Sequence, residues 1–217
     1  MDNSSSSNGL ESSNSSNTVM NPYEMSRERS RSDFDRGQAL RVSSVYSLPF
    51  RGNLLVSGWQ LSGIFSAASG PPFTIVTGFD QAGFLQNTPG RPNLVAGRAP
   101  NALQGIPTQW FDPTAFSLNA VGTFGNLGRN TGFGPALWNT DFALLKDTRI
   151  AKISETFNVQ FRAEIFNIFN HTNLGLPNAN VFTQGTNGGG NRNPNAGRIT
   201  TTTTTSRQIQ LALKFIF

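Results

Sequence analysis

The chain has 217 residues, of which 36% are hydrophobic and only 13% are charged, and it contains no cysteine. The hydrophobic share is low for a globular domain, while the charged share is too low for a charge-driven disordered protein. Disulfides and thiolate metal sites are excluded. The net charge of +5 is compatible with a nucleic-acid binder, but the Lys and Arg residues are scattered without aromatic residues between them, so we expect no nucleic-acid partner.

Residues 1–38 are polar and rich in Ser and Asn, and we expect an external loop or disordered segment there. The opening MDNSSSSNGLESSNSSN has neither the basic nor the apolar region of a signal peptide. No stretch of about 18 apolar residues predicts a transmembrane helix. A transmembrane β-strand needs only about 9–11 residues of alternating pattern, so the sequence is still compatible with a transmembrane β-barrel.

Five segments alternate apolar and polar residues with a period of two, which predicts strands. They are residues 39–49, 57–68, 137–147, 156–169 and 207–217. The last segment, RQIQLALKFIF, is the most regular. From Ile209 onward, its odd-numbered positions are all apolar and include Leu211, Leu213, Phe215 and Phe217.

The connections between these strands alternate between short and long. Residues 69–136 and 170–206 are long and rich in Gly, Pro and Asn, whereas the other two connections are short turns. A compact soluble domain rarely holds structureless loops of this length, but transmembrane barrels have short turns on one side and long loops on the other. If the long loops are external, the C-terminus lies on the periplasmic side. We therefore predict an all-β fold, in which residues 39–217 form about five antiparallel up-and-down strands of a larger transmembrane β-barrel.

The alternation also predicts which side chains line the barrel lumen. Asp141, Arg162, Glu164 and Lys214 all occupy positions on the polar faces of their strands. Lys or Arg in the middle of a lipid-facing surface would cost about 2–4 kcal/mol, and none is placed there. A soluble antiparallel sheet with one buried face gives the same alternation. Such a sheet would expose two unpaired edge strands, and it would not account for the two long loops.

Several segments together resemble the C-terminal barrel of TonB-dependent receptors, and among them the large Oar-like receptors of acidobacterial type. The similarity spans nearly the whole chain, and its most specific parts are RAEIFNIFNHTNLGLP and GRITTTTTTSRQIQLALKFIF. The other parts are SRERSRSDFDRGQALRVSSVYSLPF and GWQLSGIFSAASGPPFTI. The final aromatic residue after Leu211, Leu213 and Phe215 resembles the signal read by the outer-membrane β-barrel assembly machinery, which implies that machinery as a partner.

The resemblance implies a protein of the Gram-negative outer membrane, in contact with its lipid. Such receptors carry a signal peptide, a plug domain that contacts TonB and a barrel of about 22 strands, so this chain is expected to be a receptor fragment without the plug. The intact protein would take up large nutrients such as siderophores, glycans or peptides, and the sequence names no ligand. The alternatives are a barrel anchor for adhesion or surface structure without transport, and a soluble β-sandwich lectin.

No residue pattern indicates an enzyme, a cofactor or a metal site. His171 is the single histidine, and no second one exists to share a metal. Asp33 and Asp35 are two carboxylates without the rest of a Ca²⁺ loop, so turn capping is the better interpretation. The stretch GTNGGGN at 185–191 lacks the GK[ST] of a phosphate-binding loop.

Overall fold

The structure is a computed structural model that describes residues 20–21, 23–83, 89–101, 103–152, 154–186 and 189–217. The chain divides into two compact units. The sheet unit consists of Gln38–Ala68, Leu137–Asn173 and Thr203–Phe217. The connection unit consists of Ser69–Ala136, Leu174–Thr202 and the N-terminal segment to Gly37, of which residues 1–19 and 22 lie outside the described part.

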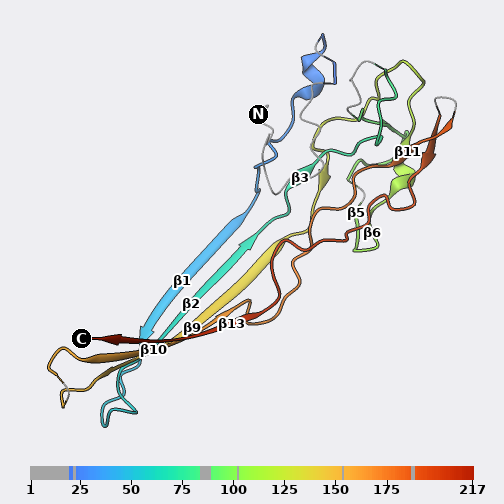
Figure 1. Cartoon of the computed structure of the whole chain (residues 1–217). Coiled ribbons are helices and arrows are strands. Elements are labelled where there is room, and N and C mark those ends of the chain that lie inside the picture. The colour runs from blue at the N-terminus through green and yellow to red at the C-terminus, as the bar shows by residue number, and fades with distance from the viewer. Residues whose placement is uncertain (1–19, 22, 84–88, 102, 153, 187–188) are drawn as a thin grey trace. The chain divides into compact units, whose positions relative to one another are not determined.

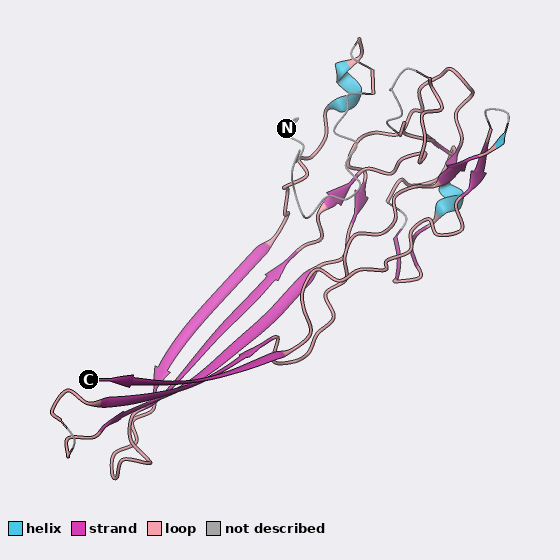
Figure 2. Cartoon of the chain, in the orientation of Figure 1, coloured by secondary structure: helices cyan, strands magenta, loops and turns pink. Residues whose placement is uncertain are grey.

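The sheet unit is a single antiparallel sheet in which neighbouring strands in space are also successive long strands in sequence (Figures 1 and 2). The order is β1-β2-β9-β10-β13, so the chain runs up and down without a crossover. This arrangement confirms the predicted all-β antiparallel fold. The strands are β1 (Ala39–Ser47), β2 (Trp59–Ala68), β9 (Leu137–Arg149), β10 (Asn158–Phe166) and β13 (Gln208–Ile216).

The strand ends differ from the predicted ones where the backbone leaves the extended region. The fourth strand was expected to continue to residue 169, but it ends at Phe166 because Asn167 adopts a positive φ of 52°. The third strand is longer than expected, since its ladder with β10 continues to the pair Asn158 and Arg149. Alternation alone therefore located the strands but not their last residues.

The short connections lie at one end of the sheet and the long ones begin and end at the other. At the first end, Ser47 pairs with Gln60, and Asn158 pairs with both Arg149 and Ile216. The C-terminus is therefore at the short-turn end, as the connection lengths predicted. Within the turn that precedes β2, Gly58 has φ +78°, and a Cβ there would lie 2.2 Å from the Asp147 carbonyl oxygen.

Two asparagines hold the chain in place by hydrogen bonds where it leaves β10. Asn167 is buried, donates to the carbonyls of His171 and Thr205, and accepts from the His171 amide. Asn173 is 1% exposed and pairs with both the N–H and the carbonyl of Trp138, each at 2.9 Å. These amide side chains replace backbone partners where the strand ladder has ended, which fixes the path from β10 back to β13.

The connection unit is built from short antiparallel pairs and 3-10 turns rather than from long strands. The pairs are β3 (Pro72–Phe73) with β8 (Gly132–Phe133), β4 (Asn93–Leu94) with β7 (Phe116–Ser117), β5 (Leu103–Ile106) with β6 (Gln109–Phe111), and β11 (Phe182–Gln184) with β12 (Gly190–Arg192). The 3-10 helices that lie wholly among the described residues are η1 (Met25–Glu28) and η2 (Pro113–Ala115).

This unit has its own apolar core, which the sequence had not predicted. Phe111 and Phe116 are each 1% exposed and pack edge to face, with ring centroids 6.0 Å apart. Ile75 and Val181 are fully buried beside them in the same cluster. Residues 69–136 and 170–206 were expected to be structureless loops, but the structure folds the described parts of 69–136 and 174–202 together around this core.

Two buried ion pairs attach the N-terminal segment to the rest of the connection unit. Arg91 and Glu28 form a bidentate pair, with their closest atoms 2.6 Å apart, and both side chains are about as buried as core residues. Arg129 Nη2 contacts Asp33 Oδ1 at 3.1 Å in a second buried pair. The described part of segment 1–38 is thus held by charge-assisted hydrogen bonds in a site with little water.

Candidate functional site: a sheet with two opposite faces

The register of the sheet places most of the apolar residues of the five strands on one side. Directly opposed residues of antiparallel strands share a face. Val42 opposes Phe65, Leu61 opposes Leu144, and Ala163 opposes Leu211. We call this surface the apolar face; its members include Leu40, Val42, Tyr46, Trp59, Leu61, Phe65, Trp138, Phe142, Leu144, Val159, Phe161, Ala163, Ile165, Ile209, Leu211, Leu213 and Phe215.

The apolar face is widely exposed. Leu211 is 70% exposed, Ile209 is 62% and Leu40 is 56%, although each sits in a regular strand. A soluble sheet buries such a face under a second layer, because apolar surface in contact with water is costly. A continuous exposed apolar surface of this kind indicates contact with lipid or with another protein.

Tryptophans lie near both ends of this face. Trp59 is the first residue of β2, and Trp138 is the second of β9. Their rows are eight residues apart, because Trp59 pairs with Lys146 while Trp138 pairs with Ala67. At about 3.4 Å per residue this is about 27 Å along the strands, or about 20 Å in height at a tilt of about 40°. The spacing is comparable to the apolar band of about 25 Å in outer-membrane barrels, where aromatic girdles mark both rims.

Lys146 is a cation on the apolar face that sequence reasoning overlooked. Its position follows from its pairing with Trp59 and Phe161. The side chain is buried at the short-turn end, where Nζ donates to the Leu54 carbonyl at 2.8 Å and lies 5.6 Å from the centre of the Trp59 ring. The sequence did indicate this position, since residues two apart in a strand lie on the same face and Lys146 follows the apolar-face residue Leu144 by two.

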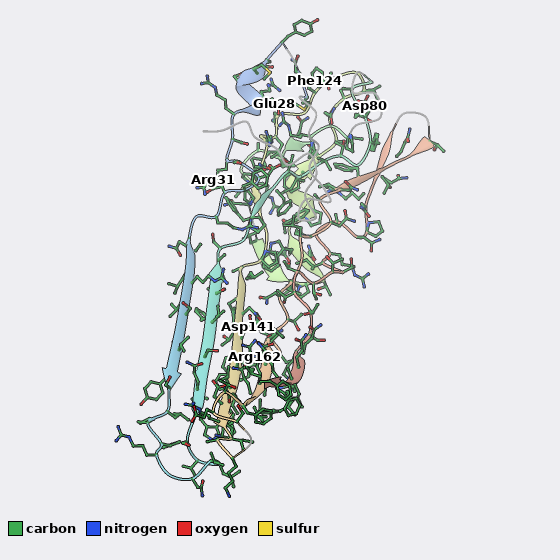
Figure 3. The ribbon with its side chains drawn as sticks, turned by 60° about the vertical axis from the view of Figure 1, so that its left-hand side comes forward. Glu28, Arg31, Asp80, Phe124, Asp141 and Arg162 are labelled. Carbon is green, nitrogen blue, oxygen red and sulfur yellow. The ribbon has the colours of Figure 1, made fainter. Side chains whose placement is uncertain are left out.

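The four residues predicted to line the lumen all lie on the side opposite the apolar face, here called the polar face. Arg162 and Glu164 are neighbours on β10, with Nη1 and Oε1 3.6 Å apart, and both are partly exposed. Lys214 pairs across the ladder with Gln160, and Asp141 of β9 pairs with Ile64. Figure 3 shows Asp141 and Arg162 on their strands.

Asp141 also has a structural role that the sequence did not indicate. Its Oδ1 accepts from the Asn139 side chain at 2.7 Å and from the Asn167 backbone N–H at 2.9 Å. The second contact satisfies an amide at the position where β10 ends. Asp147 acts similarly near the other end of the polar face, where it accepts from Asn158 and Gln160.

The four residues predicted as a barrel-assembly signal occupy one face of β13. Leu211, Leu213 and Phe215 are each more than half exposed, and Phe217 follows them in the same parity. The Phe217 ring contacts the Phe157 ring, with centroids 5.3 Å apart. β13 pairs with β10 on one side, and no strand in the described part of the chain pairs with its other edge.

The remaining polar candidates have structural partners. Asp33 pairs with Arg129, and Asp35 pairs with Arg31 at 3.4 Å, so arginines occupy both carboxylates. The His171 ring stacks on Trp138 at a centroid distance of 3.9 Å. Residues 187–188 of the glycine-rich stretch lie outside the described residues.

One carboxylate of the connection unit has a perturbed pKa. The Thr114 hydroxyl donates to Asp112 Oδ1 at 2.6 Å, and this hydrogen bond, helped by the Thr114 amide and the Arg98 and Arg192 charges, lowers the pKa of Asp112. Asp112 is the N-cap of η2. Its ionised form therefore stabilises the turn that leads into the buried Phe116.

The comparisons with known proteins agree with the geometry of the sheet. A family described as an outer membrane beta barrel domain matches residues 1–210. The chain belongs to this family. Neither a curated protein nor a solved structure gives a significant match.

The outer surface of an outer-membrane β-barrel domain contacts lipid, which explains the exposed apolar face of this chain. Lipid replaces the second layer that a soluble sheet would need, and the aromatic rows lie where such domains meet the headgroups. Among the described residues no helix is both long and apolar enough to span a membrane.

Proposed function

We propose that this outer-membrane β-barrel domain forms wall and lumen of a TonB-dependent receptor, which takes up large nutrients such as siderophore complexes, glycans or peptides. The observation that carries the proposal is the separation of an apolar face from a polar face that bears Arg162, Glu164 and Lys214. A water-filled lumen accommodates such charges, whereas lipid does not. The segments that resemble TonB-dependent receptors, such as RAEIFNIFNHTNLGLP, support the assignment to this class of receptor.

The five strands are proposed to be one arc of a larger barrel. β1 and β13 each pair on one side only within the described residues. An open edge exposes unpaired backbone groups, which the hydrocarbon of a bilayer cannot satisfy. Single-chain barrels of the bacterial outer membrane have about 8 strands or more, so further strands would cover both edges. TonB would act through a plug domain inside the closed barrel.

The connection unit is proposed to face the cell exterior and contribute to ligand capture. Long connections of outer-membrane barrels are extracellular, and here they are folded around a core and two buried ion pairs. A preformed surface of this kind binds a ligand with a smaller loss of conformational entropy than disordered loops would. The ligand class is not specified by these residues.

Uptake measurements in the native host test the transport proposal. Cells with and without the gene would be supplied with labelled ferric siderophores, oligosaccharides and peptides, in the presence and absence of TonB. Transport by this protein predicts uptake of at least one class that requires both. If cells without the gene took up every class normally but lost surface attachment, the protein would instead be an adhesive or structural anchor.

Variants of the polar face separate the two functions further. Arg162→Gln and Glu164→Gln remove lumen charges without changing the apolar face, so they should alter uptake rates and leave attachment intact. Their effect is read against Lys152→Gln, which removes an exposed charge from the short turn between β9 and β10 rather than from the lumen. Equal uptake by all three variants would argue against a lumen role for β10.

The end of β13 is proposed to be read by the outer-membrane β-barrel assembly machinery. Its apolar side chains are exposed and its outer edge is open, so an assembly factor can pair with it. Phe217→Ser should lower the amount of protein in the outer membrane, whereas Ile216→Ser on the other face should have a smaller effect. Equal membrane levels for both variants would contradict this role.

A further inference from the structure

The short connection between β1 and β2 lies at the short-turn end of the sheet (Figure 1). It presents exposed apolar side chains where a turn would ordinarily be polar. Leu54, Leu55 and Val56 are 55%, 79% and 44% exposed, and Phe50 at the start of the connection is 53% exposed. Such a cluster is typical of a surface that contacts an apolar partner.

Two anchors hold this connection against the end of the apolar face. Trp59 Nε1 donates to the Leu55 carbonyl at 3.0 Å, and Lys146 Nζ donates to the carbonyls of Leu54, at 2.8 Å, and of Ser57. Trp59 and Lys146 are a directly opposed pair and both belong to the apolar face. The turn therefore continues the surface that faces lipid.

Within residues 53–57, most backbone groups find partners within the protein. The Asn53 side chain accepts from the amides of Leu55 and Val56, at 3.1 and 3.2 Å. The Asn53 carbonyl accepts from the amide and the hydroxyl of Ser57. Together with the carbonyls held by Lys146 and Trp59, this pairing leaves few backbone groups of residues 53–57 in need of water, which favours placing this part of the turn at the lipid boundary.

We propose that residues 50–57 are a membrane-interface anchor whose partner is phospholipid of the leaflet at the short-turn end. Leu54, Leu55 and Val56 insert into the boundary between headgroups and acyl chains, and the exposed Arg51 meets the headgroup phosphates. Continuity with the apolar face and the internally paired backbone favour lipid over a protein partner. The proposal depends on the membrane location of the family and not on transport.

The test is a depth measurement with nitroxide labels on the full protein in vesicles of phosphatidylethanolamine and phosphatidylglycerol. The 217 residues of this chain contain no cysteine, so each variant introduces one labelling site into this part of the protein. Leu55→Cys reports the anchor, Leu211→Cys reports the lipid-facing strand, and Ala151→Cys reports an exposed site in the other short turn. Accessibility to oxygen and to a water-soluble nickel complex gives the depth of each label.

We expect the label at residue 55 to lie about 5–10 Å below the phosphate level, close to the behaviour of the strand label. Water accessibility equal to that of residue 151 would overturn the proposal. Dipolar broadening between labels at residue 55 would also overturn it, because that result would identify a second copy of the chain as the partner.

A second measurement examines the anchor itself. Lys146→Met removes the ammonium that holds two carbonyls, so the label at residue 55 should gain mobility and several-fold greater access to the nickel complex. Lys152→Met, in the other short turn, is the matched control and should change neither. An unchanged label in Lys146→Met would show that Lys146 does not position the turn.

Discussion

Placing the same side chain on each face of the sheet should have unequal costs. Ala163 lies on the apolar face between Leu144 and Leu211, and Ala143 lies on the polar face between Ser62 and Glu164. Ala163→Arg puts a guanidinium toward lipid, whereas Ala143→Arg puts it beside a carboxylate in water. The two variants differ only in the face that carries the charge.

The magnitude follows from the depth of Ala163 in the sheet. It is two residues from Phe161, whose row contains Lys146, so it lies about 7 Å along the strand from the short-turn rim. An arginine costs about 2–4 kcal/mol at the midplane of the bilayer and about 0–1 kcal/mol near its surface. At this intermediate depth we expect Ala163→Arg to lower the free energy of unfolding by about 2 kcal/mol.

Urea unfolding of the full protein in lipid vesicles, followed by the fluorescence of its tryptophans, measures this difference. Ala143→Arg should stay within about 1 kcal/mol of the parent, since an exposed ion pair with Glu164 is worth little. If both variants lost the same free energy, or if Ala143→Arg lost more, the assignment of the two faces would be refuted.

Three further changes probe single contacts. Glu28→Gln leaves Arg91 buried without a counter-charge, so the connection unit should lose about 3–5 kcal/mol and become sensitive to limited proteolysis; unchanged protease resistance would contradict this. Asn173→Ala leaves the Trp138 backbone groups unpaired and should cost about 1–3 kcal/mol in urea unfolding, and a neutral result would show that water replaces the side chain. The folded pKa of Asp112 is lowered, so its contribution to the free energy of unfolding is present above the ordinary pKa of about 4 and is lost as the pH falls through the folded value. Asp112→Asn should remove this part of the pH dependence of unfolding. An unaltered pH profile would exclude the effect.

The sheet was predictable because its information is local. In β13, for example, alternate residues from Ile209 to Phe215 are apolar, and this period survives in the structure as one face. The strand ends were less predictable, since they depend on single backbone torsions such as that of Asn167. The face on which Lys146 lies followed from the same alternation. Its carbonyl partners belong to the connection between β1 and β2, and they could not be predicted from the sequence.

The connection unit could not be predicted from periodicity. Its strands are two to four residues long, too short for an alternating pattern to be visible. Its decisive contacts join distant parts of the chain, as between Glu28 and Arg91 or between Thr74 and Asn130. A high content of Gly, Pro and Asn suggested loops, yet a few phenylalanines and aliphatic residues brought together by the fold are enough to build a core.

The separation of the two faces also limits how the length of this protein can change during evolution. Because side chains alternate with a period of two, an insertion or deletion of one residue within β10 would turn Phe161 and Ile165 toward water and Arg162 and Glu164 toward lipid. Related sequences should therefore differ in length within the connections, whereas the strands should change length only at their ends or by two residues at a time.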